Sequence, residues 1–399
     1  MERSPHILVL NAGSSSLKFA LYPATAEPAE ALCRGAIRDI GAGARFDLAH
    51  CPEANAGQWR IEARTHEEAV IELLRWLEQH PHQPRLAAAG HRIVHGGELF
   101  SRPVPLNERI LQQLDALVPL APLHLPHNLA AVRELARHHP GLPQVGCFDT
   151  AFHHDMPPVE RHFAIPHAWQ DLGVRRYGFH GLSYEYIAEV LPEYLGAAAD
   201  GRIVVAHLGS GASLCALHGR RSLATTMSFT PLDGVPMATR PGQLDPGAVL
   251  YLLQQGLDVE AIAHGLNFES GLRGLSGLSG DLRTLLASHQ PAARLAVDYF
   301  VHHVHRAIGS LVAALGGLDA LVFTAGIGEN APRIRQRLCD LGAWLGLALD
   351  PEANLSGRGR ISPRHHQPSV WVIPTDEELM VARHTWRLTA RLIQPEDHP

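Results

Sequence analysis

The chain contains the same short pattern twice. Residues 7–21 read ILVLNAGSSSLKFAL, and residues 203–217 read IVVAHLGSGASLCAL. Each segment begins with an apolar run, continues through small Gly and Ser residues, and ends with a second apolar run, which is the pattern of a β-hairpin with a tight turn. Because a repeated supersecondary unit indicates duplication, we expect two related domains whose hairpin tips face one cleft. Chance similarity between two apolar hairpins is the alternative.

The rest of the chain alternates between strand and helix patterns. We expect strands within 87–97, 142–152 and 318–328, and helices at 65–80, 291–315 and the C-terminal DEELMVARHTWRLTARLI. Thr65 and Glu68 have the spacing of a capping box, and Gly316 is placed to end the longest helix. This alternation is typical of the α/β class, with mixed sheets because of the hairpins, and 399 residues are enough for two domains.

Composition excludes several kinds of partner. The formal net charge of −6 lacks the basic surplus of a nucleic-acid binder. No apolar run is long enough to span a bilayer, and the first residues, MERSPHILVL, lack the pattern of a signal peptide. We therefore expect a cytoplasmic protein that binds neither nucleic acid nor membranes.

The cysteines and histidines lack the spacing of metal sites. The five cysteines include no C-x-x-C pair and are expected to be buried or idle thiols in a reducing compartment. They are Cys33, Cys51, Cys147, Cys215 and Cys339. Among the 27 histidines, the segment HEEAV places Val70 where the second ligand of an H-E-x-x-H motif would stand. We therefore expect no zinc site.

Three Gly-rich segments follow apolar strands. They are NAGSSS (11–16), HLGSGAS (207–213) and FTAGIGENAPRIR (323–335). Glycine lets backbone N–H groups approach an anion closely, and such turns bind phosphate. In the third segment we expect a helix to begin near Asn330, with Pro332 in its first turn and an anion site at its N-terminus. Walker A, Rossmann and serine-hydrolase motifs are absent from the sequence, so the three turns together predict a nucleotide cleft.

Nine short motifs follow one another between residue 7 and about residue 390. They are NAGSSSLKF, GHRIVHGGE, FDTAFH, YGFHG, HLGSGASL, SFTPLDG, GLSGLSGDLR, TAGIGEN and PTDEELMVARHT. In content and order they resemble the acetate kinase (acetokinase) family. The resemblance implies the duplicated, ribonuclease H-like fold of actin, hexokinase and the sugar kinases. It places an actin-like domain at 1–151, completed by a C-terminal helix at 379–399, and a nucleotide-binding actin-like domain at 152–378.

The resemblance also implies an activity. The reaction would be a reversible, in-line transfer of phosphoryl from ATP to acetate, which gives acetyl phosphate and ADP on a route to acetyl-CoA. Mg²⁺ is the implied metal cofactor, with Mn²⁺ as a substitute, and a homodimer is the implied assembly. A propionate or butyrate kinase of the same family, a non-catalytic actin-like nucleotide switch and a phosphatase on the same fold are the alternatives.

The matching motif positions imply the residues of the site. The implied catalytic residues are Asp149, His180 and Arg240, and the implied substrate-binding residues are Arg92, Val94, Leu123, Phe179 and Pro231. The implied nucleotide-binding residues are Lys18, His207, Leu208, Gly209, Ser210, Gly211, Asp281, Leu282, Arg283, Gly326, Ile327, Gly328, Glu329 and Asn330. The implied metal ligands are Asn11 and Glu377.

The chemistry of the reaction explains why these residue types are needed. A carboxylate that attacks a phosphoryl group meets charge repulsion, and the transition state spreads negative charge over the equatorial oxygens. The planar guanidinium groups of Arg92 and Arg240 suit those oxygens. The implied task of Asp149 is to order Mg²⁺ or Arg240 rather than to accept a proton, since acetate is already ionised. Lys18 is the only lysine among the 34 basic residues.

Several positions depart from the usual motifs of the family. They are Leu182 and Tyr184 in HGLSY, where HGTSH is usual, Ser210 in place of asparagine, Ala325 in place of glycine, and Ala238, Pro241 and Gln243 around the second arginine. None of these changes removes a charged catalytic group. They bear on kinetic constants, nucleotide preference and acceptor range rather than on the class of reaction.

Overall fold

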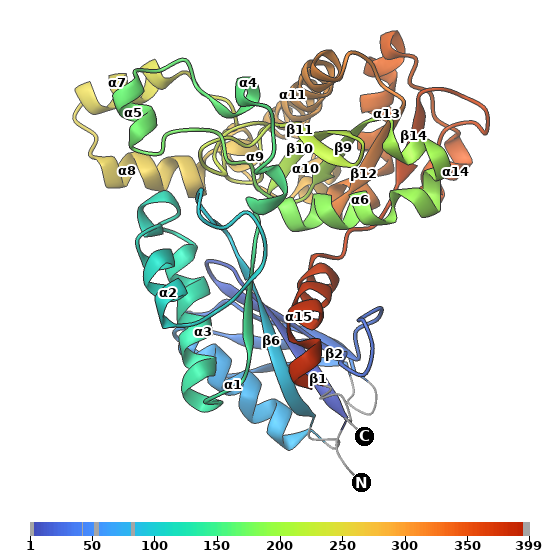
Figure 1. Cartoon of the computed structure of the whole chain (residues 1–399). Coiled ribbons are helices and arrows are strands. Elements are labelled where there is room, and N and C mark those ends of the chain that lie inside the picture. The colour runs from blue at the N-terminus through green and yellow to red at the C-terminus, as the bar shows by residue number, and fades with distance from the viewer. Residues whose placement is uncertain (1–3, 42, 52–55, 81–83, 394–399) are drawn as a thin grey trace. The chain divides into compact units, whose positions relative to one another are not determined.

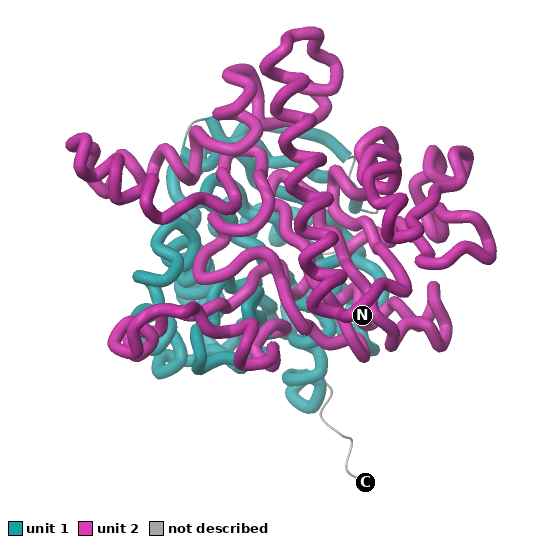
Figure 2. Tube along the Cα trace, turned by 90° about the horizontal axis from the view of Figure 1, so that it is seen from above, with its two compact units in different colours: residues 1–151, 376–399 teal, residues 152–375 magenta. Residues whose placement is uncertain are grey.

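The computed structural model describes residues 4–41, 43–51, 56–80 and 84–393. It divides into two compact units, which Figure 2 shows in different colours: unit 1 is Met1–Ala151 with Asp376–Pro399, and unit 2 is Phe152–Thr375. The boundaries expected from the sequence motifs were 151/152 and 378/379, so the second one lies three residues beyond the division at 375/376. Among the described helices, none is long and apolar enough to cross a membrane.

Unit 1 is built on one mixed sheet. In its described residues the strand order is β5-β4-β3-β2-β1-β6-β8-β7. The strands are β1 (Pro5–Ala12), β2 (Ser16–Pro23), β3 (Cys33–Arg38), β4 (Arg45–His50), β5 (Gly57–Arg60), β6 (Arg85–Ile93), β7 (Val104–Pro105) and β8 (Gln144–Phe148). From β1 to β5, each strand pairs antiparallel with the next strand along the chain. Strand β6 is parallel to both β1 and β8.

Helices cover both faces of this sheet (Figure 1). They are α1 (His66–Gln79), α2 (Glu108–Asp115), α3 (Leu125–His138) and α15 (Glu377–Ile393). Alternate apolar residues of β1 and β2, such as Leu10 and Phe19, form a core with α1 and α3. On the other face α15 packs against β1 and β6. This contact is close because Gly90 has no side chain: a Cβ there would lie 2.2 Å from Thr385 Oγ1.

Unit 2 has a second mixed sheet. In its described residues the order is β11-β10-β9-β12-β14-β13. The strands are β9 (Arg202–Leu208), β10 (Ala212–His218), β11 (Arg221–Thr225), β12 (Ala320–Thr324), β13 (Gly359–Arg360) and β14 (Ser369–Val372). The helices are α4 (Pro158–Arg161), α5 (His167–Asp171), α6 (Gly181–Leu195), α7 (Pro246–Gln254), α8 (Val259–His264), α9 (Gly271–Ser276), α10 (Leu282–Ala287), α11 (Pro291–Leu315), α12 (Ala325–Asn330), α13 (Pro332–Leu341) and α14 (Pro351–Ser356). Apolar residues of α6 form a core with β9, β10 and β12, while α11 packs against β9, β10 and β11.

The two sheets share one topology, which confirms the duplication. In each unit the first strand forms an antiparallel hairpin with the second and pairs in parallel with a later strand. Asn11 pairs with Lys18 across the hairpin of unit 1, and His207 pairs with Ser213 across the hairpin of unit 2. The predicted α/β class with two related halves and mixed sheets is therefore confirmed.

Several local predictions are confirmed by the helix boundaries. Helix α1 begins after Thr65, whose side chain accepts from the Glu68 backbone N–H. Helix α11 spans Pro291–Leu315 and ends at Gly316, which has a φ of 69°. Helix α15, Glu377–Ile393, confirms the predicted C-terminal helix as far as residue 393, and the rest of the predicted range 379–399 lies outside the described residues.

The prediction for residues 323–335 was confirmed for the helix with Pro332 in its first turn, since α13 begins at Pro332, but it was wrong for the two glycines before that helix. Helix α12 begins at Ala325, directly after β12, so Gly326 and Gly328 are helical rather than part of a turn. A break at Ala331 precedes a second helix, α13, that starts at Pro332. The physical reason is that proline has no N–H to donate, so α12 cannot continue through it. Ala325 has a φ of 65°, a conformation that favours glycine.

The prediction of five idle thiols was wrong for two cysteines. Cys33 and Cys51 form a disulfide, whereas Cys147, Cys215 and Cys339 are buried and outside any disulfide. The two bonded cysteines are separated by 18 residues, which span the antiparallel pair β3–β4. The sheet pairs Arg34 with His50, so the flanking cysteines face one another. Strand pairing, which the cysteine spacing does not show, brings them together.

Candidate active site

In unit 1 the predicted site residues gather around one guanidinium group. Asn11 and Arg92 are paired near the ends of the parallel strands β1 and β6, and Asp149 follows the adjacent strand β8. Arg92 Nε donates to Asp149 Oδ1 at 3.0 Å, and Arg92 Nη1 donates to Asn11 Oδ1 at 3.0 Å. A third hydrogen bond runs from Arg92 Nη2 to Asp149 Oδ2. Glu377, at the start of α15, has Oε2 3.8 Å from Arg92 Nε.

The charges in this cluster shift one another's pKa. Burial raises the pKa of Asp149 to about 6, with Glu377 adding to the increase and Arg92 opposing it. Burial alone would lower the pKa of Arg92, but the charges of Asp149 and Glu377 outweigh it and raise that pKa. The pKa of Glu378 is also raised, by burial and by Glu377. Asp149 and Glu377 therefore flank one arginine, and with the amide oxygen of Asn11 they make the cluster rich in oxygen ligands.

In unit 2 the hairpin β9–β10 holds a second group of predicted residues. A Cβ on Gly211 would lie 2.6 Å from Arg240 Nη2 and 3.4 Å from His180 Nε2, so the missing side chain lets both groups approach the hairpin. The rings of His180 and His207 stack with centroids 4.2 Å apart. Arg240 Nη1 donates to the carbonyl of Pro231 at 2.8 Å.

The neighbours of the two histidines explain one unusual position, Tyr184. His180 precedes α6 with a φ of 59°, a strained conformation of the kind found at functional sites. Its Nδ1 is hydrogen-bonded to Ser213 Oγ at 2.9 Å, and Tyr184, where the family usually has histidine, is hydrogen-bonded to the same oxygen at 2.5 Å. His207 Nδ1 is hydrogen-bonded to Ser183 Oγ at 2.7 Å. Tyr184 therefore supports the orientation of His180 through a shared hydroxyl group.

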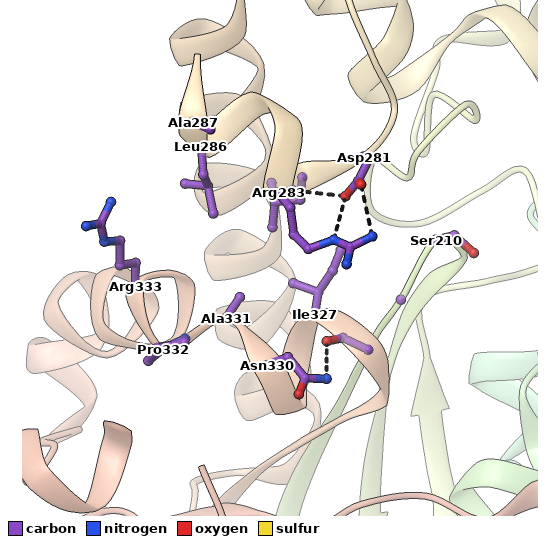
Figure 3. A pocket seen from close by; sticks show the side chains of 13 residues that line it. Ser210, Asp281, Arg283, Leu286, Ala287, Ile327, Asn330, Ala331, Pro332 and Arg333 are labelled. Carbon is purple, nitrogen blue, oxygen red and sulfur yellow. Dashed lines mark hydrogen bonds and ion pairs between the residues drawn. The ribbon is translucent and has the colours of Figure 1, made fainter. Parts of the chain in front are cut away.

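A pocket of about 700 Å³ lies within unit 2 (Figure 3). It is lined by Gly209, Ser210, Asp281, Leu282, Arg283, Leu286, Ala287, Gly326, Ile327, Asn330, Ala331, Pro332 and Arg333. The side chain of Asp281 accepts from the Arg283 backbone N–H at 3.0 Å and from its guanidinium at 3.2 Å. Asn330 Nδ2 donates to the carbonyl of Gly326 at 2.9 Å. Three segments that are distant in sequence therefore form one pocket.

The other predicted nucleotide-binding residues do not line this pocket. His207, Leu208, Gly211, Gly328 and Glu329 adjoin its lining in the chain, and Lys18 belongs to unit 1. Lys18 lines a separate cavity of about 180 Å³, together with Arg34 and Glu378.

The predicted acceptor residues are divided between the units. Val94 and Leu123 belong to unit 1, and Phe179 and Pro231 belong to unit 2. The Val94 backbone N–H donates to Asn128 Oδ1 at 2.9 Å, and the Phe179 carbonyl accepts from His153 Nε2 at 3.0 Å. Phe179 is buried, whereas Leu123 is partly exposed.

Sequence reasoning missed several residues of this region. Leu286, Ala287 and Arg333 line the pocket. Leu286 and Ala287 gave no signal because apolar residues on an amphipathic helix are ordinarily core residues, and Arg333 gave none because a single arginine is ordinarily a surface residue. Arg335 is fully buried and donates from Nη1 to the carbonyls of Gly328 and Glu329, at 2.9 and 2.8 Å. It thus satisfies carbonyls at the end of α12 that the helix break leaves without helical partners.

Known proteins resemble this chain in sequence and in architecture. A model of the acetokinase family matches residues 6–383. The acetate kinase of Rhodopseudomonas palustris is 54% identical over 389 residues, covering 96% of this chain and 98% of that protein. The acetate kinase of Rhizobium meliloti is 48% identical over 386 residues, with coverage of 96% and 98%.

Solved structures agree with the family match. The acetate kinase of Porphyromonas gingivalis has a TM-score of 0.86 at 35% identity, covering 96% of this chain and 100% of that chain. A propionate kinase from Francisella tularensis has a TM-score of 0.89 at 36% identity, with coverage of 96% and 99%. The chain therefore belongs to the acetokinase family and is an enzyme that transfers a phosphoryl group.

Proposed function

We propose that this enzyme transfers the γ-phosphoryl group of ATP to acetate, reversibly and in line. A carboxylate oxygen of acetate forms the new bond to phosphorus while the bond to the ADP oxygen breaks. The observation that carries the proposal is the orientation of Arg92. Arginine has five N–H groups, and the hydrogen bonds from Arg92 to Asp149 and Asn11 use three of them. The others remain for the oxygens of acetate or of the transferring phosphoryl group.

Arg240 and His180 supply positive and polar groups from unit 2. Both approach the β9–β10 hairpin over Gly211. Phosphoryl transfer depends mainly on positioning and on compensation of the developing negative charge. We assign Arg240 and His180 to the transferring phosphoryl group, and Arg92 with Val94, Leu123, Phe179 and Pro231 to acetate. Asp149 holds Arg92, whereas the sequence had predicted Mg²⁺ or Arg240 as the group that Asp149 orders.

The pocket of unit 2 is the proposed nucleotide site. Its volume of about 700 Å³ lies within the range of small-ligand pockets, which combine apolar walls with a few polar groups. Leu282, Leu286 and Ile327 supply apolar surface, which suits the base and ribose. Gly209 and Ser210, at the turn after β9, would meet the phosphates.

The cluster in unit 1 fits a hard divalent cation. Mg²⁺ prefers oxygen ligands, retains several water molecules and needs one or two carboxylates. Asn11 and Glu377 offer an amide and a carboxylate oxygen beside Arg92. The pKa of Asp149 and that of Glu378 are raised mainly by burial, with the charge of Glu377 adding to both increases. When bound, Mg²⁺ would neutralise charge on the phosphates. We propose Asn11 and Glu377 as its protein ligands.

The substitution Glu377→Gln tests this assignment. It should raise the Mg²⁺ concentration needed for half-maximal activity, because a neutral amide is a weaker ligand than a carboxylate. Titration of activity with Mg²⁺, and with Mn²⁺ as the substitute, measures the change. Glu30→Gln, which changes an exposed acidic residue of unit 1, is the control and should leave the titration unchanged. An unchanged titration in Glu377→Gln would move the ligand role to Asp149 or Glu378.

The acceptor and the reaction are tested in one assay. Acyl phosphate is trapped as a hydroxamate after incubation with ATP, Mg²⁺ and acetate, propionate or butyrate. We expect the highest kcat/KM with acetate. A higher value with propionate would favour the second candidate, which the likeness to a propionate kinase supports. Hydrolysis of ATP without any acyl phosphate, in either direction, would contradict the proposal and favour a nucleotide switch or a phosphatase.

We also propose that the enzyme is a homodimer that works in the cytoplasm. Large apolar side chains are exposed on unit 2, and such surfaces ordinarily mark interfaces. They include Val159, Trp169, Leu172, Leu250, Tyr251 and Val259. Light scattering coupled to size-exclusion chromatography measures the assembly. A mass equal to one chain at micromolar concentration would contradict the dimer.

A further inference from the structure

Two sulfur atoms and one imidazole nitrogen lie together in unit 1, outside the proposed active site. Cys33 begins β3, Cys51 follows β4, and His80 follows the last residue of α1. Their side chains are buried, with 1%, 6% and 6% of their surface exposed. Their ligand atoms lie within 4.8 Å of one another. Among the described residues this is the one group of three or more Cys, His, Asp or Glu side chains arranged so closely.

The geometry of the group resembles that of a metal chelate. With Zn–S near 2.3 Å and Zn–N near 2.0 Å, tetrahedral angles place a sulfur and a nitrogen ligand about 3.5 Å apart. Cys51 Sγ and His80 Nε2 are 3.4 Å apart. The two cysteines are held by neighbouring strands with Cα atoms 4.2 Å apart. Reduction would therefore leave two thiols side by side, next to an imidazole nitrogen at ligand distance.

The position of His80 is a second observation that points to a cation. A disulfide needs no imidazole beside it, whereas a thiolate pair gains a third ligand from one. The His80 ring contacts Trp76 edge-on at 5.4 Å between centroids, which fixes its orientation. It also lies at the C-terminal end of α1, where the helix dipole favours positive charge.

We propose that the reduced chain binds one zinc ion through Cys33 Sγ, Cys51 Sγ and His80 Nε2, with water as the fourth ligand. Zinc is favoured because it prefers sulfur and imidazole ligands, whereas Mg²⁺ prefers oxygen. The disulfide and the zinc site are alternative states of the same residues. A dithiol reductant supplies two electrons and two protons to the disulfide and is itself oxidised to a disulfide. Zinc then displaces the two thiol protons.

Cobalt titration tests the site directly. The full-length chain is reduced with a dithiol, freed of reductant without oxygen, and titrated with Co²⁺, which takes zinc sites and gives a thiolate-to-metal charge-transfer absorption. We expect this band to saturate at one Co²⁺ per chain and to disappear when Zn²⁺ is added. Co²⁺ bound at the oxygen ligands of the active site gives no such band. The oxidised chain should show none.

Variants identify the ligands. Cys33→Ser and Cys51→Ser should each abolish the band, and His80→Gln should weaken Co²⁺ binding at least tenfold. Cys339→Ser, which changes a buried cysteine of unit 2, is the matched control and should retain the band. Far-ultraviolet circular dichroism and kinase activity report whether each variant folds. Zn²⁺ should also raise the melting temperature of the reduced chain but not that of reduced Cys33→Ser.

Three results would overturn the proposal. They are the absence of a charge-transfer band in the reduced chain, its persistence in folded Cys33→Ser, and an equal band in the oxidised chain. If Cys33→Ser fails to fold, the His80→Gln variant decides, because it leaves the disulfide partners in place. An unchanged Co²⁺ affinity in His80→Gln would remove the imidazole from the site and contradict the inference.

Discussion

The hairpins β1–β2 and β9–β10 occupy the same place in their sheets but carry different chemistry. Asn11 and His207 are equivalent, since each lies near the end of the first strand and pairs both across its hairpin and with a parallel strand. Asn11 accepts a hydrogen bond from Arg92, whereas His207 stacks on His180. The shared backbone determines where a functional side chain stands, and the residue type determines what it does there.

The two halves also differ in how they position an arginine. Arg92 is held by the hydrogen bonds that it donates to Asp149 and Asn11. Arg240 makes a hydrogen bond to the carbonyl of Pro231 and passes over Gly211, where a side chain is missing. Unit 1 therefore positions Arg92 through an ion pair with a buried carboxylate. Unit 2 positions Arg240 mainly through the space that the missing side chain of Gly211 leaves. Substitutions can test this difference.

The largest expected effect is the loss of either arginine. Arg92→Ala and Arg240→Ala should each lower kcat by roughly 10³–10⁵-fold, the range for arginines that compensate charge on a transferring phosphoryl group. Steady-state kinetics measures the loss, and lysine should rescue it poorly because ammonium lacks the planar fork. The exposed ion pairs Arg45–Asp39 and Arg220–Asp200 supply controls: Arg45→Ala and Arg220→Ala should leave kcat unchanged. Near-normal turnover in Arg240→Ala would remove that residue from the site.

The second prediction tests positioning by charge. Asp149→Asn should lower kcat about 10²-fold, because a misplaced catalytic group costs about this much. The pKa of Asp149 is raised from 3.8 to about 6 in the fold, so the folded chain binds the proton more tightly than the unfolded chain does. The wild-type free energy of unfolding should therefore decline, relative to Asp149→Asn, as pH rises from about 4 to about 6.

Denaturant unfolding of both proteins across this pH range measures the difference. Groups outside the cluster titrate alike in the two proteins, so the comparison reports on Asp149 together with the charged groups beside it. A stability difference that does not change with pH would contradict the raised pKa. A kcat that stays at the wild-type value in Asp149→Asn would contradict the role of Asp149 in holding Arg92.

The third prediction tests positioning by space. Gly211→Ala should lower kcat about tenfold or more, because the new Cβ would lie 2.6 Å from Arg240 Nη2 and displace the guanidinium. Gly265→Ala is the control, since a Cβ there meets no atom within 4 Å. Kinetics with both substrates, together with thermal unfolding, separates a displaced arginine from a damaged fold. Equal activity in the two variants would show that Arg240 does not depend on this glycine.

The smallest effect is expected at Ser210, an exposed residue that lines the pocket of unit 2. Ser210→Asn should lower the KM for ATP several-fold, equivalent to about 0.5–1.5 kcal/mol for one added hydrogen bond. The amide of asparagine has two donor hydrogens and a longer reach than the serine hydroxyl. The KM for acetate should not change, because Arg92 belongs to the other unit. An equal change in both KM values would contradict placement of Ser210 at the nucleotide.

Much of the fold follows from local sequence pattern. The hairpins, α1 with its Thr65 cap and α11 with its terminal Gly316 were predicted from residues that are neighbours in the chain. Such signals survive folding because they depend on backbone conformation and on short-range hydrogen bonds. The family motifs likewise identified the segments that line the pocket, since those segments are contiguous.

The sequence by itself determined the duplicated architecture and the residue types of the site, while the tertiary structure decided which of them act together. Asp149 and Arg92 become partners because β6 and β8 are adjacent in the sheet. Cys33, Cys51 and His80 meet because strand pairing and the end of α1 bring three segments to one point. These contacts depend on distances in space between residues far apart in the chain. Local pattern carries no record of such distances, so only the folded chain shows them.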